Sequence, residues 1–150
     1  MQINTPKSLL AFDFGLARIG VAVGQTITGT ARALATIQWQ PETPDWSAIE
    51  TLIDDWQPDL LLVGLPVNAE GEDTDQCAPA RAFAAELGDY ELPVQLIDEH
   101  LTSSEAKSRM REERQSGRRK KRIAKPEIDA MSAVLIAEQW LAERNIGRQF

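Results

Sequence analysis

Cysteine and histidine are almost absent from this chain. Among its 150 residues, Cys77 is the only cysteine and His100 is the only histidine. A single cysteine cannot form a disulfide within the chain, and a zinc site needs several Cys or His ligands. The composition therefore argues against a disulfide-stapled fold and a zinc centre. It fits the reducing cytoplasm, where we expect the protein to reside.

Long apolar runs are also missing. No stretch approaches the ~20 apolar residues that a membrane span needs, and no charged segment followed by an apolar one opens the sequence. We therefore expect neither a membrane span nor a secretion signal. The sequence shows no internal repeat, and a chain of 150 residues can bury roughly 68–70% of its unfolded surface as one domain. We predict a single domain over residues 1–150.

Positive charge is scarce overall and concentrated in one segment of a chain whose formal net charge is −7. Residues 107–125 hold ten basic and two acidic residues, a balance of +8, whereas the rest holds six basic and 21 acidic residues, a balance of −15. This asymmetry indicates contact with a polyanion such as nucleic acid, and a solvated helix end and loop is the alternative. The residues expected to hold a nucleic-acid backbone are Arg18, Lys107, Arg109, Arg111, Arg118, Arg119, Lys120, Lys121 and Arg122.

The hydrophobic periodicity predicts a mixed α/β fold. Two apolar runs, 9–14 and 60–64, indicate buried strands that lie side by side and run parallel. The short link after the first strand favours an antiparallel hairpin that a third strand extends into a meander. The predicted strands are 9–14, 19–24, 30–38, 60–64 and 94–99, and the predicted helices are 44–56, 73–88, 102–115 and 125–144. This order implies a five-stranded mixed sheet flanked by helices.

Three acidic residues stand at informative places in this predicted fold. Asp13 interrupts the first apolar run, Glu99 ends the last strand, and Asp129 lies in the first turn of the last helix. A carboxylate within an apolar run is costly to bury without compensation, which favours a metal-binding or catalytic role for Asp13. Each acid also has a plainer interpretation. Asp13 could pair with Arg18, Glu99 could be a surface acid, and Asp129 could favour the helix N-terminus.

The face of the last helix suggests how the three acids could meet. Ser132, Ala133 and Ile136 share the face of Asp129, and this small-then-apolar face is expected to pack on the sheet and carry Asp129 toward Asp13. Two carboxylates about 4 Å apart repel by roughly 4 kcal/mol at an effective dielectric near 20. Three together would hold a proton or a divalent cation, and oxygen-only ligation favours Mg²⁺ or Mn²⁺. Two such ions would activate a water and stabilise the leaving oxygen in phosphodiester hydrolysis.

Four motifs follow one another along nearly the whole chain: Phe12-Asp13-Phe14-Gly15 with Arg18 to Gly24, Val63 to Gly71, Asp98 to Ser103, and Ile128-Asp129-Ala130. Together they resemble the YqgF (RuvX) family of bacterial nucleases, named for pre-16S rRNA processing or Holliday junction resolution. The resemblance implies a ribonuclease-H-like fold and metal-dependent phosphodiester cleavage, with Asp13, Glu99 and Asp129 at the family's acidic positions. It also implies maturation of the 5′ end of pre-16S rRNA in ribosome biogenesis, where ribosomal subunits or assembly factors are candidate partners.

One residue departs from the family pattern. The family usually carries Arg directly after the acid of its third motif, where this chain has His100. Arginine clamps phosphate bidentately, whereas histidine is mostly uncharged near neutral pH. We expect His100 to be a weaker substrate contact or an exposed side chain without a role, and Asn68 to border the site. Two alternatives stay open, namely a Holliday-junction-resolvase-like endonuclease acting on branched DNA and a non-catalytic RNA-binding assembly factor on the same fold.

Overall fold

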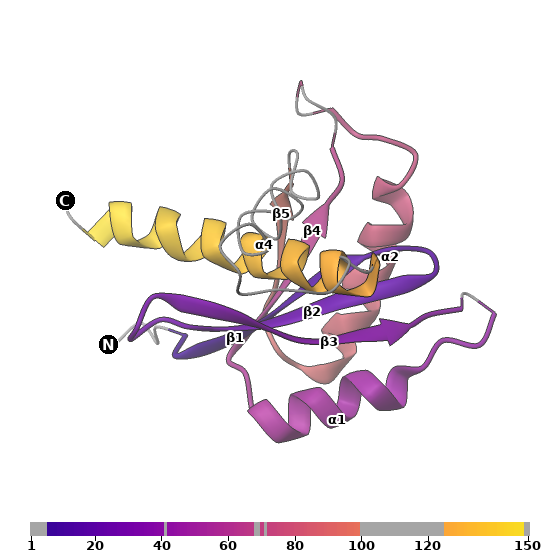
Figure 1. Ribbon diagram of the computed structural model, residues 1–150, viewed down its shortest axis with the longest axis horizontal. Helices are drawn as coiled ribbons and strands as arrows, with labels where there is room; N and C mark the ends of the chain where they lie inside the picture. Colours follow the sequence, from indigo (N-terminus) through magenta and orange to yellow (C-terminus); the bar gives the residue numbers. More distant parts are fainter. Residues whose placement is uncertain (1–5, 41, 68–69, 71, 100–124, 149–150) are drawn as a thin grey trace, which may run out of the picture.

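The computed structural model describes the backbone of residues 6–40, 42–67, 70, 72–99 and 125–148, and the side chains of these residues except 125–129 and 144–148. Figure 1 shows how the elements are arranged. The strands are β1 (Ser8–Phe14), β2 (Arg18–Gln25), β3 (Thr30–Gln38), β4 (Leu60–Leu65) and β5 (Val94–Asp98). The helices are α1 (Trp46–Trp56), α2 (Cys77–Leu87), the short 3₁₀ helix η1 (Gly88–Tyr90) and α4 (Lys125–Arg148).

Within the described residues, five strands form one mixed sheet in the order β3-β2-β1-β4-β5. β2 pairs antiparallel with both β1 and β3, which gives the predicted meander. β4 pairs parallel with both β1 and β5. The two parallel strands at the centre, β1 and β4, are covered on both faces, which explains their continuous apolar sequences. The predicted five-stranded mixed sheet is confirmed.

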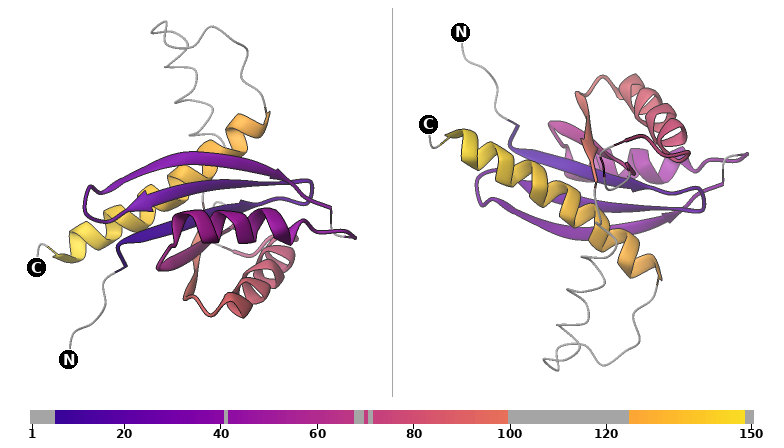
Figure 2. Two further views of the ribbon diagram at one scale, coloured as in Figure 1. Left: turned by 90° about the horizontal axis from the view of Figure 1, so that it is seen from below. Right: turned by 90° about the horizontal axis from the view of Figure 1, so that it is seen from above.

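Alternate side chains of β1 point into two different cores. Leu10 and Phe12 pack in the core that α1 and α2 cover, whereas Leu9 and Ala11 pack against α4. Figure 2 shows α4 crossing one face of the sheet while α1 and α2 lie on the other. Because the period of two continues to the end of the strand, Asp13 belongs to the α4 face and Phe14 to the α1/α2 face.

The loop before α2 is tied to the end of β4, and α2 therefore begins later than predicted. The Thr74 hydroxyl donates a hydrogen bond to the Pro66 carbonyl oxygen at 2.6 Å. This contact holds residues 73–76 outside the helix, which starts at Cys77. The loop consequently stays next to the carboxyl end of β4, where parallel α/β sheets commonly place their functional residues.

α1 and α4 also differ from their predicted bounds. The Asp45 carboxylate accepts a hydrogen bond from the Ala48 amide at 3.3 Å and caps a helix that starts at Trp46, two residues later than predicted. α4 continues past its predicted end at residue 144 to Arg148. None of the helices in the described part of the chain is long and apolar enough to cross a membrane.

Candidate functional site

Asp13 and Glu99 meet at the carboxyl ends of the parallel strands. Asp13 is next to last in β1, opposite Gly20 of β2, and Glu99 directly follows β5. The Glu99 amide donates to the Leu65 carbonyl oxygen at 2.9 Å, which fixes Glu99 one residue beyond the last β4–β5 pair. The two side chains share a hydrogen bond. The structure thus brings together two of the three acids that the sequence analysis selected.

Gly64 of β4 makes room for this contact. β4 lies between the strands that carry or precede the two acids. A Cβ atom on Gly64 would collide with Glu99 Oε2, and it would lie 3.0 Å from Glu99 Cδ and 2.6 Å from Ile136 Cδ1 of α4. The Glu99 carboxyl group therefore reaches across β4 through space that only glycine leaves. This role of Gly64 was not predicted from the sequence, where the only signal for it is a glycine near the end of an apolar run.

Burial and charge hold a proton on the acid pair. Burial, followed by the negative charge of Asp13 and the hydrogen bond with it, raises the pKa of Glu99 to about 9. Glu99 Oε2 is buried and has no hydrogen-bond partner among the described residues. At neutral pH the protonated Glu99 carboxyl therefore donates to the Asp13 carboxylate. The pair carries one exchangeable proton, which a divalent cation can replace.

A polar cavity of about 240 Å³ opens beside the pair, and we call it the acid cavity. Its lining consists of Asp13, Phe14, Gly15, Arg18, Pro66, Gln76 and Glu99. The turn after β1 places Arg18 in this lining. The Gly15 amide donates to the Arg18 carbonyl oxygen at 2.9 Å, and a Cβ on Gly15 would lie only 2.7 Å from that oxygen, so the turn requires glycine. An arginine that lines the same cavity as two carboxyl groups suits the binding of a phosphate group.

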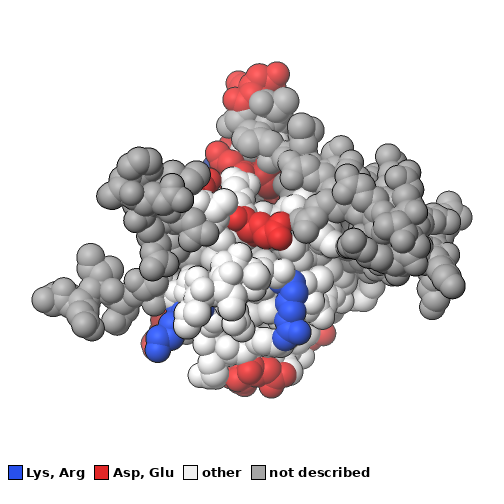
Figure 3. All heavy atoms as spheres, turned by 60° about the vertical axis from the view of Figure 1, so that its left-hand side comes forward, with Lys and Arg blue, Asp and Glu red and all other residues white. Residues whose placement is uncertain are grey.

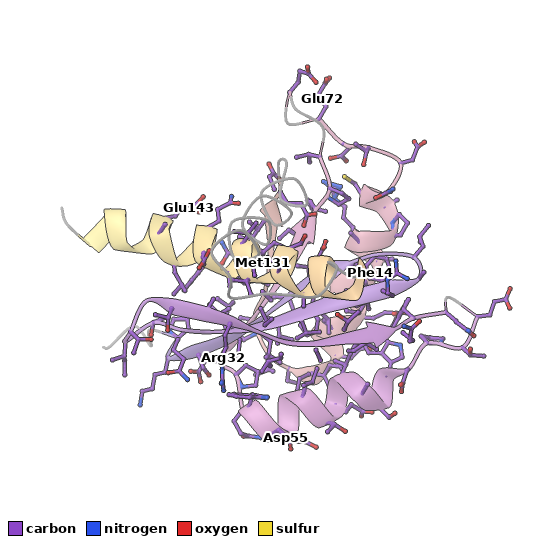
Figure 4. All side chains as sticks on the ribbon, viewed as in Figure 1. Phe14, Arg32, Asp55, Glu72, Met131 and Glu143 are labelled. Atoms are coloured by element: carbon purple, nitrogen blue, oxygen red, sulfur yellow. The ribbon has the colours of Figure 1, made fainter. Side chains whose placement is uncertain are left out.

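The α4 face that was predicted to approach the sheet is buried. Ser132 is 0% and Ile136 is 1% exposed, and Ile136 reaches the space above Gly64. Met131, beside Ser132 on α4, is labelled in Figure 4. The backbone of Asp129 lies one turn earlier in this helix, but its side chain is outside the described residues. Its approach to the acid pair stays a prediction.

Most of the predicted nucleic-acid contacts lie outside the described residues. These are Asn68, His100, Lys107, Arg109, Arg111 and the run 118–122, together with the predicted helix 102–115. The described side chains include four Lys or Arg against 18 Asp or Glu, and Figure 3 shows how sparse the basic ones are on one face. Over the same part of the chain, no group of three His, Cys, Asp or Glu residues is placed to hold a metal. Only two of the three predicted acids have described side chains.

Sequence comparisons identify relatives over most of the chain. Residues 7–143 match the family model of RuvX, which is described as a Holliday junction resolvase. A protein of Azotobacter vinelandii is 44% identical over 147 residues, covering 97% of this chain and 100% of the relative. A protein of Pectobacterium atrosepticum is 47% identical over 135 residues, covering 89% and 94%. Both relatives are provisionally named pre-16S rRNA nucleases.

Two solved structures of similar fold are Holliday junction resolvases. RuvC of Thermus thermophilus, in complex with a Holliday junction substrate, superposes with a TM-score of 0.54 at 13% identity, covering 92% of this chain and 95% of that one. The yeast mitochondrial Holliday junction resolvase gives a TM-score of 0.53 at 17% identity, with coverages of 95% and 83%. Likeness at these identities concerns the fold alone. It confirms the ribonuclease-H-like fold class predicted from the sequence.

Proposed function

This chain belongs to the RuvX family, and we propose that it is a divalent-metal-dependent nuclease that matures the 5′ end of pre-16S rRNA. The nuclease class, a hydrolase of phosphodiester bonds in nucleic acid, was predicted from the sequence and is confirmed by the family match and the names of the relatives. The catalytic residues, the metal and the ribosomal substrate are the proposal. The observation that carries it is the buried Asp13–Glu99 pair beside a polar cavity that also contains Arg18.

Asp13, Glu99 and Asp129 are proposed to hold Mg²⁺ or Mn²⁺. Their donor atoms are carboxylate oxygens, which these hard cations prefer. The Glu99 Oε2 atom without a hydrogen-bond partner among the described residues, together with the raised pKa of the carboxyl group, fits a cation position. When bound, such ions supply an activated water and stabilise the leaving oxygen of a phosphodiester.

The other residues of the acid cavity position the substrate. Arg18 is proposed to hold the phosphate group at the scissile bond, since a guanidinium pairs two oxygens of a phosphate at once. Gly64 keeps the path of the Glu99 side chain open. Glu99 gives up its proton when the cation binds, so that both carboxylates are ionised in the active state.

The proposed substrate is precursor ribosomal RNA within the assembling small subunit, in the cytoplasm. The names of the relatives support this choice. Residues 1–150 act as one nuclease domain in this proposal, and ribosomal proteins or assembly factors are its partners. Asn68 is proposed to border the site, and His100 to be a weaker contact with the substrate. The residues proposed to hold the RNA backbone together with Arg18 are Lys107, Arg109, Arg111 and the run 118–122.

The test compares cleavage of a pre-16S rRNA fragment that spans the 5′ boundary with cleavage of a four-way DNA junction, each with Mn²⁺ and with EDTA. Asp13→Asn keeps the side-chain shape and removes the charge. Asp98→Asn is the matched control because Asp98 is an exposed acid at the end of β5. RNA cleavage that EDTA and Asp13→Asn abolish, and that Asp98→Asn retains, supports the proposal.

Two other outcomes would replace it. Cleavage of the junction alone would establish the resolvase activity that the description of the family model names. Binding of RNA without cleavage of either substrate would support the assembly-factor alternative.

A further inference from the structure

A second cavity, lined by rings, adjoins the acid cavity. It has a volume of about 210 Å³, and we call it the ring cavity. Its walls include Phe14, Leu16, Trp39, Ala82, Phe83 and Glu86. Phe14 lines both cavities, so the two meet around the end of β1. The position of Phe14 is labelled in Figure 4.

The rings of this cavity are fixed by one another. Phe14 stacks on Phe83 with ring centroids 4.9 Å apart, and Trp39 meets Phe83 edge-on with centroids 5.5 Å apart. Trp46 of α1 stacks on the same Phe83 at 5.5 Å. A wall packed in this way loses little conformational freedom when a ligand binds. Leu16, in contrast, is 57% exposed and adds a large apolar side chain that is open to solvent.

We propose that the ring cavity binds one unpaired nucleobase of the RNA, next to the phosphate in the acid cavity. This inference rests on the proposed nuclease function and adds that cleavage occurs beside an unpaired nucleotide. Single-stranded RNA is commonly recognised by stacking its splayed bases on Phe, Tyr or Trp side chains. Phe14 lines both cavities, so one nucleotide can place its phosphate among the polar groups and its base against Phe14 and Leu16. Trp39 and Phe83 are only 5% and 2% exposed and form the packed support behind this surface.

Glu86 indicates that the occupant is a base rather than the backbone. Its carboxylate is the acidic group in the lining of the ring cavity, and it would repel a phosphate. A carboxylate accepts hydrogen bonds from the exocyclic amino group of cytosine. The cavity volume is also below the ~300–1,000 Å³ of typical small-molecule sites, which suits a single ring system presented by a polymer.

The test measures RNA binding in an Asp13→Asn background, so that its result does not depend on cleavage. Ala82→Leu fills the ring cavity from an exposed position on α2. Ala85→Leu is the matched control because Ala85 is also exposed on α2 and does not line the cavity. The probe is a short, labelled single-stranded RNA whose Kd is measured by fluorescence anisotropy at one salt concentration. A scan of the same RNA with one abasic nucleotide at each position in turn completes the design.

We expect Ala82→Leu to weaken RNA binding about tenfold and Ala85→Leu to leave it unchanged. In the abasic scan, removal of the base at one position should weaken binding to the Asp13→Asn protein by a similar factor. With that abasic RNA, the added Ala82→Leu substitution should cause no further loss of affinity. Equal Kd values for the two leucine variants, or a loss in Ala82→Leu that persists with every abasic RNA, would overturn the inference. If Ala82→Leu lowers the Tm, Leu16→Ala replaces it, with an expected loss of about threefold that the same abasic RNA removes.

Cleavage results stay separate from these outcomes. If the wild-type protein cuts no RNA but the abasic scan identifies a base site, the nuclease proposal fails and the ring cavity still binds a base. If cleavage occurs and the two leucine variants bind alike, the nuclease proposal stands and the ring cavity has no role in binding RNA.

Discussion

Replacing Glu99 by glutamine should stabilise the metal-free protein, and the gain should grow with pH. Glutamine keeps the shape of the side chain and can donate a hydrogen bond to Asp13, but it does not ionise. In the wild-type protein the pKa of Glu99 is raised from 4.5 to about 9, mainly by burial. The folded state therefore binds this proton more tightly than the unfolded state. The stability that the protonated Glu99 contributes is fully present below pH 4.5 and is lost as pH rises toward 9.

The size of the effect follows from the two pKa values. Each pH unit between them changes the free energy of unfolding by about 1.36 kcal/mol. At pH 7 the unfolded wild-type chain has gained roughly 3 kcal/mol from ionising Glu99, since pH 7 lies 2.5 units above the pKa of 4.5 in the unfolded state. Glu99→Gln gives the unfolded chain no such advantage. Its free energy of unfolding should exceed that of the wild type by a few kcal/mol at pH 7, and the difference should shrink toward pH 4.5.

Urea unfolding in EDTA from pH 5 to pH 8 measures this difference. The wild type, Glu99→Gln and the control Asp98→Asn are compared at each pH, so that contributions from other titrating groups cancel. We expect the difference in free energy of unfolding from the wild type to widen with pH for Glu99→Gln alone. A constant difference for both variants would refute the reasoning that Glu99 is held protonated in the folded, metal-free protein.

Three further predictions concern activity and binding. Gly64→Ala should lower the rate of RNA cleavage about 100-fold because the added Cβ displaces the Glu99 carboxyl group. Gly88→Ala is the control, since its Cβ would meet nothing within 4 Å, and it should cleave at the wild-type rate. Equal activities of the two variants in a cleavage assay would exclude the proposed role of Gly64. At subsaturating Mg²⁺, kcat/KM should rise with pH and level off only above pH 9, because only ionised Glu99 binds the cation and its pKa is about 9. A flat pH profile would contradict this. If about six phosphates are neutralised, log affinity for single-stranded RNA should fall with log salt at a slope near −4. Glutamines in place of 118–122 should flatten that slope, and an unchanged slope would remove the basic run from the interface.

The order of the central strands was predictable because their apolar sequences restrict where they can lie in the sheet. A continuous apolar sequence such as Leu60–Leu65 can only be buried on both faces, which places it beside β1 in a parallel arrangement. Asp13 was recognisable for the same reason, since a carboxylate within an apolar run needs compensation. The alternation of core residues along β1 then assigned Asp13 to the face that α4 covers.

The details of the site depended on pairing between distant segments. Gly64 makes space for Glu99 only because β5 pairs with β4 in one register, and nothing in the local sequence reveals that register. The ring cavity was not predicted because its walls come from β1, the end of β3 and α2, which are far apart in the sequence. Taken singly, Phe14, Trp39 and Phe83 look like ordinary core residues. Their common cavity becomes visible only in the folded chain.

Cation binding by the metal-free protein tests the central claim most directly. Calorimetry at pH 7 with Mg²⁺ or Mn²⁺, repeated in buffers of different ionisation enthalpy, measures both the affinity and the number of protons released. We expect the wild type to bind the cation and to release close to one proton, since Glu99 is protonated at this pH. Binding should be much weaker in Asp13→Asn, Glu99→Gln and Asp129→Asn. Binding that these variants leave unchanged, or binding without proton release, would contradict the claim that these acids hold the metal.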